Sequence, residues 1–291
     1  MAKYKKNSNR RRNILKLFMS ILLVIVILGI SAIVYLAFNN NVSKFLVDNS
    51  AKNVSNEEAK NATPIIVNNI LLGGVYNEKF VSVDKYFFNS TNKTGTKINL
   101  YSADSKIGEY EINSVKKDNN SSTVYVATSK ENLTYEYFAT ISSKNTNYKE
   151  FVETASNDED IKRVKDSLGL YKILNTSINI HKVYDTTIKD GNKVRVILAT
   201  NEPNKSIGAY STIVIYDEFT NTAKCVKYNY VRNKKDSSDF GIISLKFVAD
   251  FNNDGTNELV IQETREFEVI YSVYTYKNGE YYEVLSSSMK I

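Results

Sequence analysis

The sequence predicts a mainly β protein with a few helices, held to a membrane by an N-terminal transmembrane helix. Three observations predict this class. A long uncharged stretch follows a basic N-terminus, runs of β-branched and aromatic residues separated by turn residues fill most of the remainder, and one central segment has a helical period. The 291 residues suffice for an anchor and one or two domains. We expect these segments: a basic cytoplasmic tail (1–16), a transmembrane helix (17–38), a stalk (39–63), a small β-rich lobe (64–146), a helical connector (147–174) and an antiparallel β lobe (175–291).

The anchor is predicted from the stretch LFMSILLVIVILGISAIVYLAF, residues 17–38, which contains no charged residue. At a rise of about 1.5 Å per residue, a helix of this length reaches about 33 Å, enough for a hydrocarbon core of about 30 Å. A cleaved signal peptide has a shorter apolar core that ends in a small-x-small site, whereas this run ends in Tyr35, Leu36, Ala37 and Phe38. The expected partner of residues 17–38 is therefore the lipid bilayer.

The charge distribution sets the expected orientation and narrows the choice of partners. Residues 1–16 carry seven Lys or Arg and no acid, so the positive-inside rule places the N-terminus in the cytoplasm and the part beyond residue 39 outside. The chain carries +6 in total, so without those seven charges the remainder sums to −1. A nearly neutral remainder gives no electrostatic basis for a nucleic-acid partner.

The small lobe is predicted from short runs with strand composition, separated by turn residues such as those at 92–95 and 118–120. Gly73 and Gly74 predict a tight turn or a bulge. The runs are Ile65–Val67, Lys79–Val83, Lys97–Tyr101, Glu109–Val115, Thr123–Thr128 and Tyr135–Ile141.

The connector is predicted to be helical. Asn157 or Asp158 would cap a helix whose apolar face carries Ile161, Val164 and Leu168, and Gly169 would end it in a left-handed conformation. We expect a preceding helix over 148–155.

The C-terminal lobe is predicted as an antiparallel meander, because strand-like runs recur with tight-turn signatures at 189–192 and 277–280. The runs are Ile178–Tyr184, Val194–Thr200, Tyr210–Tyr216, Ala223–Val231, Ile242–Ala249, Glu258–Thr264, Phe267–Tyr276 and Tyr281–Ser286.

The most specific chemical signal is the stretch ADFNNDGTNELVIQE at 249–263. Oxygen-bearing side chains fall on alternate positions of an expected tight loop, and Gly255 permits the left-handed backbone that such a curve needs. Carboxylates, an amide and a carbonyl are hard oxygen ligands that suit Ca²⁺. The expected calcium ligands are Asp250, Asn252, Asp254, Thr256 (through its carbonyl) and Glu258. The alternative is an Asn- and Asp-rich turn without an ion.

The pattern D-x-N-x-D-G-x-x-E followed by an apolar strand resembles the calcium loop of FG-GAP/VCBS repeats, found in integrin-type propeller blades. Counted from Asp250 as position 1, the pattern differs from an EF-hand in two ways. Position 12 is Ile261, where an EF-hand has a bidentate Glu, and the flanking segments are expected to be strands. The resemblance covers about 45 residues and implies that the loop joins the first two strands of a four-stranded, propeller-blade-like unit. A second copy at 186–191 would have Thr186 and Ile188 where carboxylates are needed, so we expect a plain hairpin there.

No catalytic motif stands out. The single histidine, His181, is expected to be a structural or surface residue, and the single cysteine, Cys225, a small buried hydrophobic residue. There is no Gly-rich phosphate loop, H-E-x-x-H or G-x-S-x-G. Asp158, Glu159 and Asp160 suit the first turn of a helix. A hydrolase with two carboxylates from distant strands stays an alternative.

The composition, rich in Asn, Lys, Ser and Ile with one Cys, is typical of a low-GC bacterial protein that is exported. We therefore expect a single-pass protein of the bacterial cell membrane with an extracytoplasmic, calcium-stabilised domain that binds or scaffolds an envelope protein or polymer. The alternative is a cell-envelope hydrolase or an accessory of a wall-modifying enzyme.

Overall fold

The computed structural model describes residues 53–89, 93–119, 123–129, 136–141, 147–170, 177–201, 209–231 and 240–291. All of them belong to one compact unit, Phe45–Ile291. The expected cytoplasmic tail, the transmembrane helix over 17–38 and most of the stalk lie outside the described residues. Among the helices of the described part, none has the length and apolar character needed to cross a membrane.

The described residues are mainly β, with antiparallel pairing throughout, which confirms the mainly β part of the predicted class. A seven-stranded sheet occupies the N-terminal part, in the order β1-β7-β4-β5-β6-β2-β3. Because β1 also pairs with β2, all of these strands except β3 form a closed ring, and β3 pairs with β2. The strands are β1 (Thr63–Val67), β2 (Ile70–Tyr76), β3 (Lys79–Ser82), β4 (Lys97–Tyr101), β5 (Lys106–Lys117), β6 (Val124–Thr128) and β7 (Phe138–Ile141).

Two short helices accompany this sheet. Helix α2 (Asn56–Lys60) begins at a capping box, in which Ser55 and Glu58 exchange backbone-to-side-chain hydrogen bonds. Ala59 and Ala62 are fully buried, so this end of the expected stalk is part of the folded lobe. Helix α3 (Val83–Asn89) buries Tyr86.

Gly73 and Gly74 lie inside β2 and not in a tight turn, and the alternative of a bulge is the one that the structure bears out. Ile65 pairs with Gly73 and Ile66 with Leu71, so the register shifts beside Gly73. Gly73 has φ +147, and a Cβ on it would lie 2.2 Å from the Val81 carbonyl oxygen, so its neighbour strand leaves no room for a side chain.

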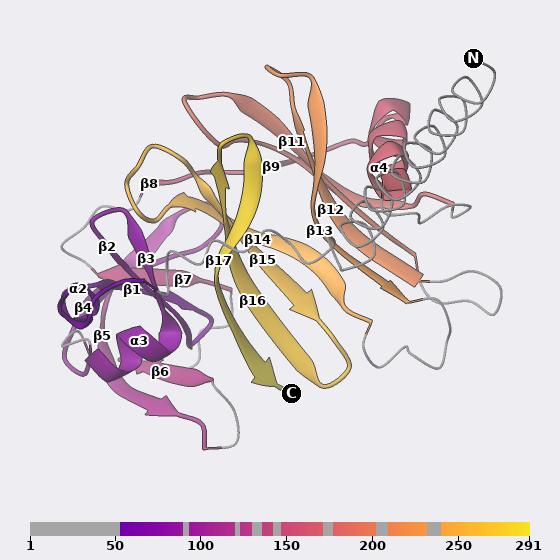
Figure 1. Cartoon of the computed structure of the whole chain (residues 1–291). Helices are drawn as coiled ribbons and strands as arrows, with labels where there is room; N and C mark the ends of the chain where they lie inside the picture. Colours follow the sequence, from indigo (N-terminus) through magenta and orange to yellow (C-terminus); the bar gives the residue numbers. More distant parts are fainter. Residues whose placement is uncertain are drawn as a thin grey trace, which may run out of the picture. The chain divides into compact units, whose positions relative to one another are not determined.

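The C-terminal part contains two five-stranded sheets of the same design (Figure 1). Each is a four-stranded meander with one short strand added beside its first strand. One sheet contains β9 (Val152–Thr154), β10 (Ile180–Thr187), β11 (Lys193–Asn201), β12 (Ala209–Asp217) and β13 (Thr222–Val231). The other contains β8 (Asn147–Tyr148), β14 (Ile242–Asp250), β15 (Glu258–Thr264), β16 (Glu268–Lys277) and β17 (Glu280–Lys290).

The short strands β8 and β9 replace the helix that we expected over 148–155, so that prediction is wrong. Both strands add to exposed edges of sheets whose other strands are distant in sequence, on β14 and β10. Phe151 packs edge-to-face on Tyr184 at 5.0 Å between ring centroids. These long-range contacts override the local helical preference.

The predicted helix is α4 (Asp158–Leu170). Asn157 caps it as predicted, because its side chain accepts from the Asp160 N–H while its own N–H donates to the Asp160 carboxylate. Val164 and Leu168 are buried against β10–β13, but Ile161 is 41% exposed, so the apolar face is narrower than predicted. The helix continues through Gly169 to Leu170, and Gly169 is not left-handed.

The sheets pack in layers, and the β14–β17 sheet is the central one (Figure 1). Its one face packs on the closed sheet through a core that includes Phe138, Phe247 and Leu72. Its other face packs on β10–β13 through a core that includes Val196, Ile213 and Leu259. Helix α4 covers the outer face of β10–β13. The β14–β15 loop therefore lies where three sheets meet.

Candidate metal centre

The loop that connects β14 to β15 has the curved backbone that the sequence predicts. Gly255 has φ +85, which is the left-handed backbone expected of the glycine in this loop. Asn253 is also left-handed, with φ +59. The pairing of Ala249 with Glu258 across the strands brings Asp250 and Glu258 to the base of the loop. Both loop ends are thereby fixed by the β14–β15 ladder.

The loop also contacts the other two sheets. The Asn257 backbone N–H donates to the Ile188 carbonyl at 2.6 Å, and the Asn257 amide donates to the Thr187 carbonyl at 2.8 Å. On the other side, the Asn252 amide donates to the Glu78 carbonyl in the β2–β3 turn at 3.2 Å. These contacts have no signature in the sequence, because all three partner residues are more than 60 positions away in the chain.

Asp250 is the buried carboxylate of the loop. Its Oδ2 atom accepts from the Gly255 N–H at 3.1 Å. Its Oδ1 atom is inaccessible to solvent and accepts no hydrogen bond from the described residues. Burial raises the pKa of Asp250 above its ordinary value, and the nearby charge of Asp254 adds to the rise.

Asn252 and Asp254 lie beside Asp250. The Asn252 amide donates to Asp254 Oδ2 at 2.9 Å, and its oxygen accepts from the Asp254 N–H at 3.2 Å. Asp254 Oδ1 accepts from the Thr256 N–H at 2.7 Å. Thr256 itself pairs with Lys189 in an isolated β-bridge. Three of the five predicted ligands thus share one side of the loop, with Thr256 at its far edge.

Glu258 has a different environment from the other four. It is fully buried, and its two oxygens accept from the Phe251 N–H and the Thr275 hydroxyl, each at 2.9 Å. Burial raises the pKa of Glu258 well above its ordinary value, with Asp254 and Asp250 adding to the rise. Through its hydrogen bond with Thr275, the Glu258 carboxylate links the loop to β16. Over the described ranges, no three His, Cys, Asp or Glu side chains form a group arranged to hold a metal ion.

A groove of about 520 Å³ adjoins this loop, and no pattern in the sequence indicates it. We call it the loop groove. It is formed by the β2–β3 turn, the β10–β11 turn, the loop itself and the β16–β17 turn. Its lining includes the charged residues Glu78, Lys79, Lys189, Asp254 and Lys277, together with Asn252 and Thr256.

No family model, curated protein or solved structure matches the chain.

The single histidine, His181, and the single cysteine, Cys225, do not form a catalytic Cys–His pair. His181 is exposed on β10. Cys225, on β13, has its thiol hydrogen-bonded with Thr212 and the Lys227 carbonyl, and burial raises its pKa to about 12. A thiol in this state is a poor nucleophile at neutral pH.

The buried acids outside the loop are paired with cations. Glu263 contacts Lys227 at 2.9 Å and Arg265 at 2.5 Å, which joins the two five-stranded sheets. Asp160 contacts Arg195 at 2.8 Å and Arg163 at 2.9 Å. The predicted place of Asp160 in the first turn of a helix is confirmed, and its contacts are those of a structural ion pair.

We expect Cys225→Ala to cost roughly 1 kcal/mol in the free energy of unfolding, because it removes one small, partly buried thiol and its hydrogen bonds. The Thr212 hydroxyl keeps a partner, since it also donates to the Lys227 carbonyl at 3.0 Å. Urea unfolding of the variant and the wild type measures the difference. A loss above about 3 kcal/mol would show that the thiol does more than fill space.

Proposed function

We propose that this chain is a single-pass, membrane-anchored extracytoplasmic protein of the bacterial cell envelope that binds or scaffolds a wall or membrane component, and that calcium stabilises its domain. The uncharged stretch at 17–38 and the seven basic residues before it support the anchor and the orientation. The β-rich unit that follows supports a binding role. Catalysis by the Cys225–His181 pair finds no support in their environments.

The observation that carries the calcium proposal is the Oδ1 atom of Asp250. A buried carboxylate oxygen without a hydrogen bond is costly, and a cation bound to it would remove that cost. Asp254 and Asn252 lie on the same side of the loop and would supply further oxygens. Thr256 would add its carbonyl, and Glu258 would join the set by exchanging its bond to Thr275. All of these are hard donors that suit Ca²⁺.

The arrangement of strands supports the resemblance to an FG-GAP/VCBS blade. The meander β14–β17 has four strands in sequence order, and the loop joins the first two of them. The meander β10–β13 has the same order, with the plain turn at Asp190–Gly191 in the equivalent place. We infer that the two are blade-like units of which the second keeps the calcium loop.

A bound ion would act on the whole junction. The loop holds hydrogen bonds to Thr187 and Ile188 on one side and to Glu78 on the other. Closing the loop around an ion would fix these three contacts together. The calcium would therefore stabilise the packing of the sheets as well as the loop.

We expect the purified full chain to melt at a higher temperature in millimolar Ca²⁺ than in chelator. An ion that binds only the folded state adds about 2.7 kcal/mol at a hundredfold excess over its Kd. Mg²⁺ is expected to help less, because its small octahedral shell tolerates few of these ligands. Differential scanning calorimetry measures the shift.

Asp250→Ala and Asp254→Ala are each expected to remove most of that shift. Asn253→Ala is the matched control, because Asn253 is exposed on the same loop and its side chain is outside the proposed ligand set. Equal melting of the wild type with and without Ca²⁺ would sink the calcium proposal and leave the stretch as a polar turn.

A further inference from the structure

We propose that the loop groove binds the oxyanions of an acidic polymer, and that it does so only when the loop holds calcium. This inference rests on the proposed function, because it names the class of ligand for the extracytoplasmic domain. The chemistry it requires is a chain bearing carboxylate or sulfate groups.

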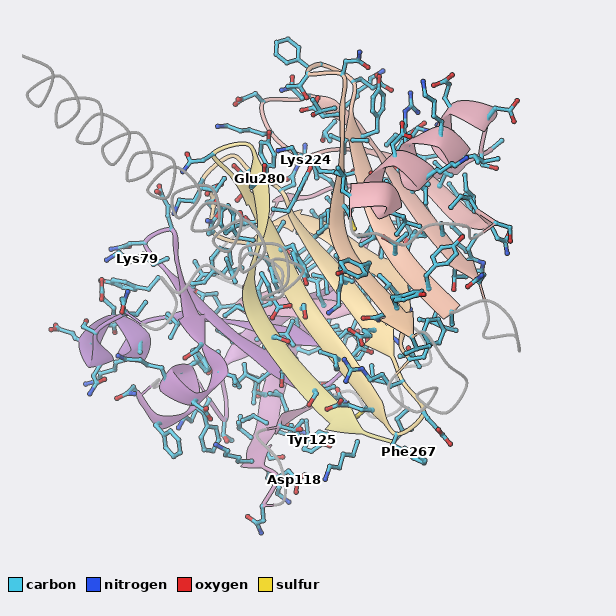
Figure 2. The ribbon with its side chains drawn as sticks, turned by 45° about the vertical axis from the view of Figure 1, so that its right-hand side comes forward. Lys79, Asp118, Tyr125, Lys224, Phe267 and Glu280 are labelled. Carbon is cyan, nitrogen blue, oxygen red and sulfur yellow. The ribbon has the colours of Figure 1, made fainter. Side chains whose placement is uncertain are left out.

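Three lysines from separate elements line the groove. Lys79 is the first residue of β3, Lys189 lies in the β10–β11 turn and Lys277 is the last residue of β16, and all three are exposed. Lys189 forms no ion pair with any acid of the described ranges. Lys79 pairs with Glu58 at 2.8 Å (Figure 2 shows its position). Because the charges come from three different elements, the groove suits a ligand with several anionic groups.

The walls of the groove are held in place by contacts between neighbouring sheets and loops. Lys224 on β13 binds Glu280 at 2.6 Å and donates to the Gly279 carbonyl, which fixes the β16–β17 turn to the neighbouring sheet. Figure 2 shows Lys224 and Glu280 directed toward one another. The isolated bridge between Lys189 and Thr256 fixes the β10–β11 turn to the loop. Prepositioned walls lower the ordering cost of binding.

The charge balance supports the requirement for calcium. Glu78 and Asp254 also line the groove and Glu58 pairs with Lys79, so without an ion three carboxylates offset the three lysines. A Ca²⁺ ion on Asp250 and Asp254 would cancel the Asp254 charge and leave the groove positive. Asn252, Asp254 and Thr256 belong to both the proposed ion site and the groove, so the ion would also fix their geometry.

The test is binding of fluorescent polymers to the full chain in detergent, measured by anisotropy at low salt, with Ca²⁺ or with chelator. The probes are oligogalacturonate, which carries carboxylates, and dextran sulfate, which carries sulfates, and neutral dextran is the blank. We expect one or both acidic polymers to bind in Ca²⁺, with affinity that falls as salt rises. The ratio of the dissociation constants of the two acidic polymers identifies the preferred oxyanion.

Lys189→Glu is expected to weaken binding about tenfold or more, because it reverses an exposed charge at close range. Lys165→Glu is the matched control, since Lys165 is exposed on α4 and lies outside the groove. Unchanged melting of both variants shows that the fold is intact. Equal weakening by the two substitutions would reduce the effect to net charge and overturn the site.

The outcomes separate this inference from the calcium proposal. A normal calcium shift in melting with no binding of either polymer overturns the groove and leaves the calcium site standing. Binding that is sensitive to Lys189→Glu but equal in Ca²⁺ and in chelator overturns the calcium dependence. Binding lost in chelator and in Lys189→Glu, but kept in Lys165→Glu, supports the proposal in full.

Discussion

Replacing Phe138 with alanine is expected to lower the free energy of unfolding by about 3–5 kcal/mol, the usual cost of deleting a buried aromatic ring. Phe138 on β7 is 1% exposed and joins the closed sheet to the central sheet. Its ring stacks on Tyr101 at 4.9 Å and meets Phe247 and Phe251 edge-on, at 5.2 and 5.3 Å between centroids. Each such pair adds about 0.5–1.5 kcal/mol beyond the buried area. Urea unfolding measures the loss.

Phe219→Ala is the matched control, because Phe219 is 80% exposed in the β12–β13 turn. We expect a change within about 0.5 kcal/mol there. Phe251 belongs to the candidate metal loop, so Phe138→Ala is also expected to reduce the calcium shift in melting. A loss below about 1 kcal/mol at Phe138 would mean that the two sheets are held together elsewhere.

Replacing Arg195 with methionine is expected to cost about 3–5 kcal/mol, because it leaves a buried carboxylate without its main partner. The guanidinium makes three contacts of 2.8–3.1 Å with Asp160, whose side chain is fully buried, and it also donates to the Ala155 carbonyl at 2.5 Å. Arg163 keeps one contact with Asp160 at 2.9 Å, so the lower end of the range is expected. Lys193→Met, on an exposed position of the same strand, is the control.

The same variant is expected to change the pH dependence of stability. Burial alone would raise the pKa of Asp160, but hydrogen bonds from Arg195, the Asn157 backbone and Arg163 outweigh it and hold the pKa below its ordinary value. A lowered pKa in the folded state gives stability that is complete above the unfolded value of about 3.9 and is lost as pH falls through the folded value. Arg195→Met should therefore lose less stability between pH 5 and 2 than the wild type does. Parallel acid profiles would contradict the role of this pair.

Much of the fold could be predicted because the local signals are strong. Tight-turn signatures at Asp190–Gly191 and Asn278–Gly279 mark hairpins, since few residues other than Gly and Asn adopt the left-handed backbone that such turns need. The strands on either side have near-continuous β-branched and aromatic residues. What could not be predicted are the elements whose reason is non-local. The strands β8 and β9 form on edges supplied by β14 and β10, and α3 has only a weak apolar period of its own.

The candidate site divides in the same way. The positions of Asp250, Asn252, Asp254 and Gly255 follow from spacing, because alternate residues on a tight loop point to one side. The environment of Glu258 does not follow from spacing, since its oxygens are taken by Phe251 and by Thr275 on the next strand. The loop groove has no signature at all, because its lysines are about 90 to 200 residues apart in sequence.

By itself the sequence determined the mainly β class, the N-cap of α4 and the hairpins and curved loop of the C-terminal part, because each depends on the conformational preferences and hydrogen bonds of residues close together in the chain. The tertiary structure decided how the three sheets stack, which acids are buried with partners and which oxygen of Asp250 is left without one. These depend on burial, and burial at any one residue is set by side chains that arrive from distant strands. The loop between β14 and β15 belongs to both levels: its backbone curve is local, while its contacts with Glu78 and Ile188 are a property of the folded domain alone.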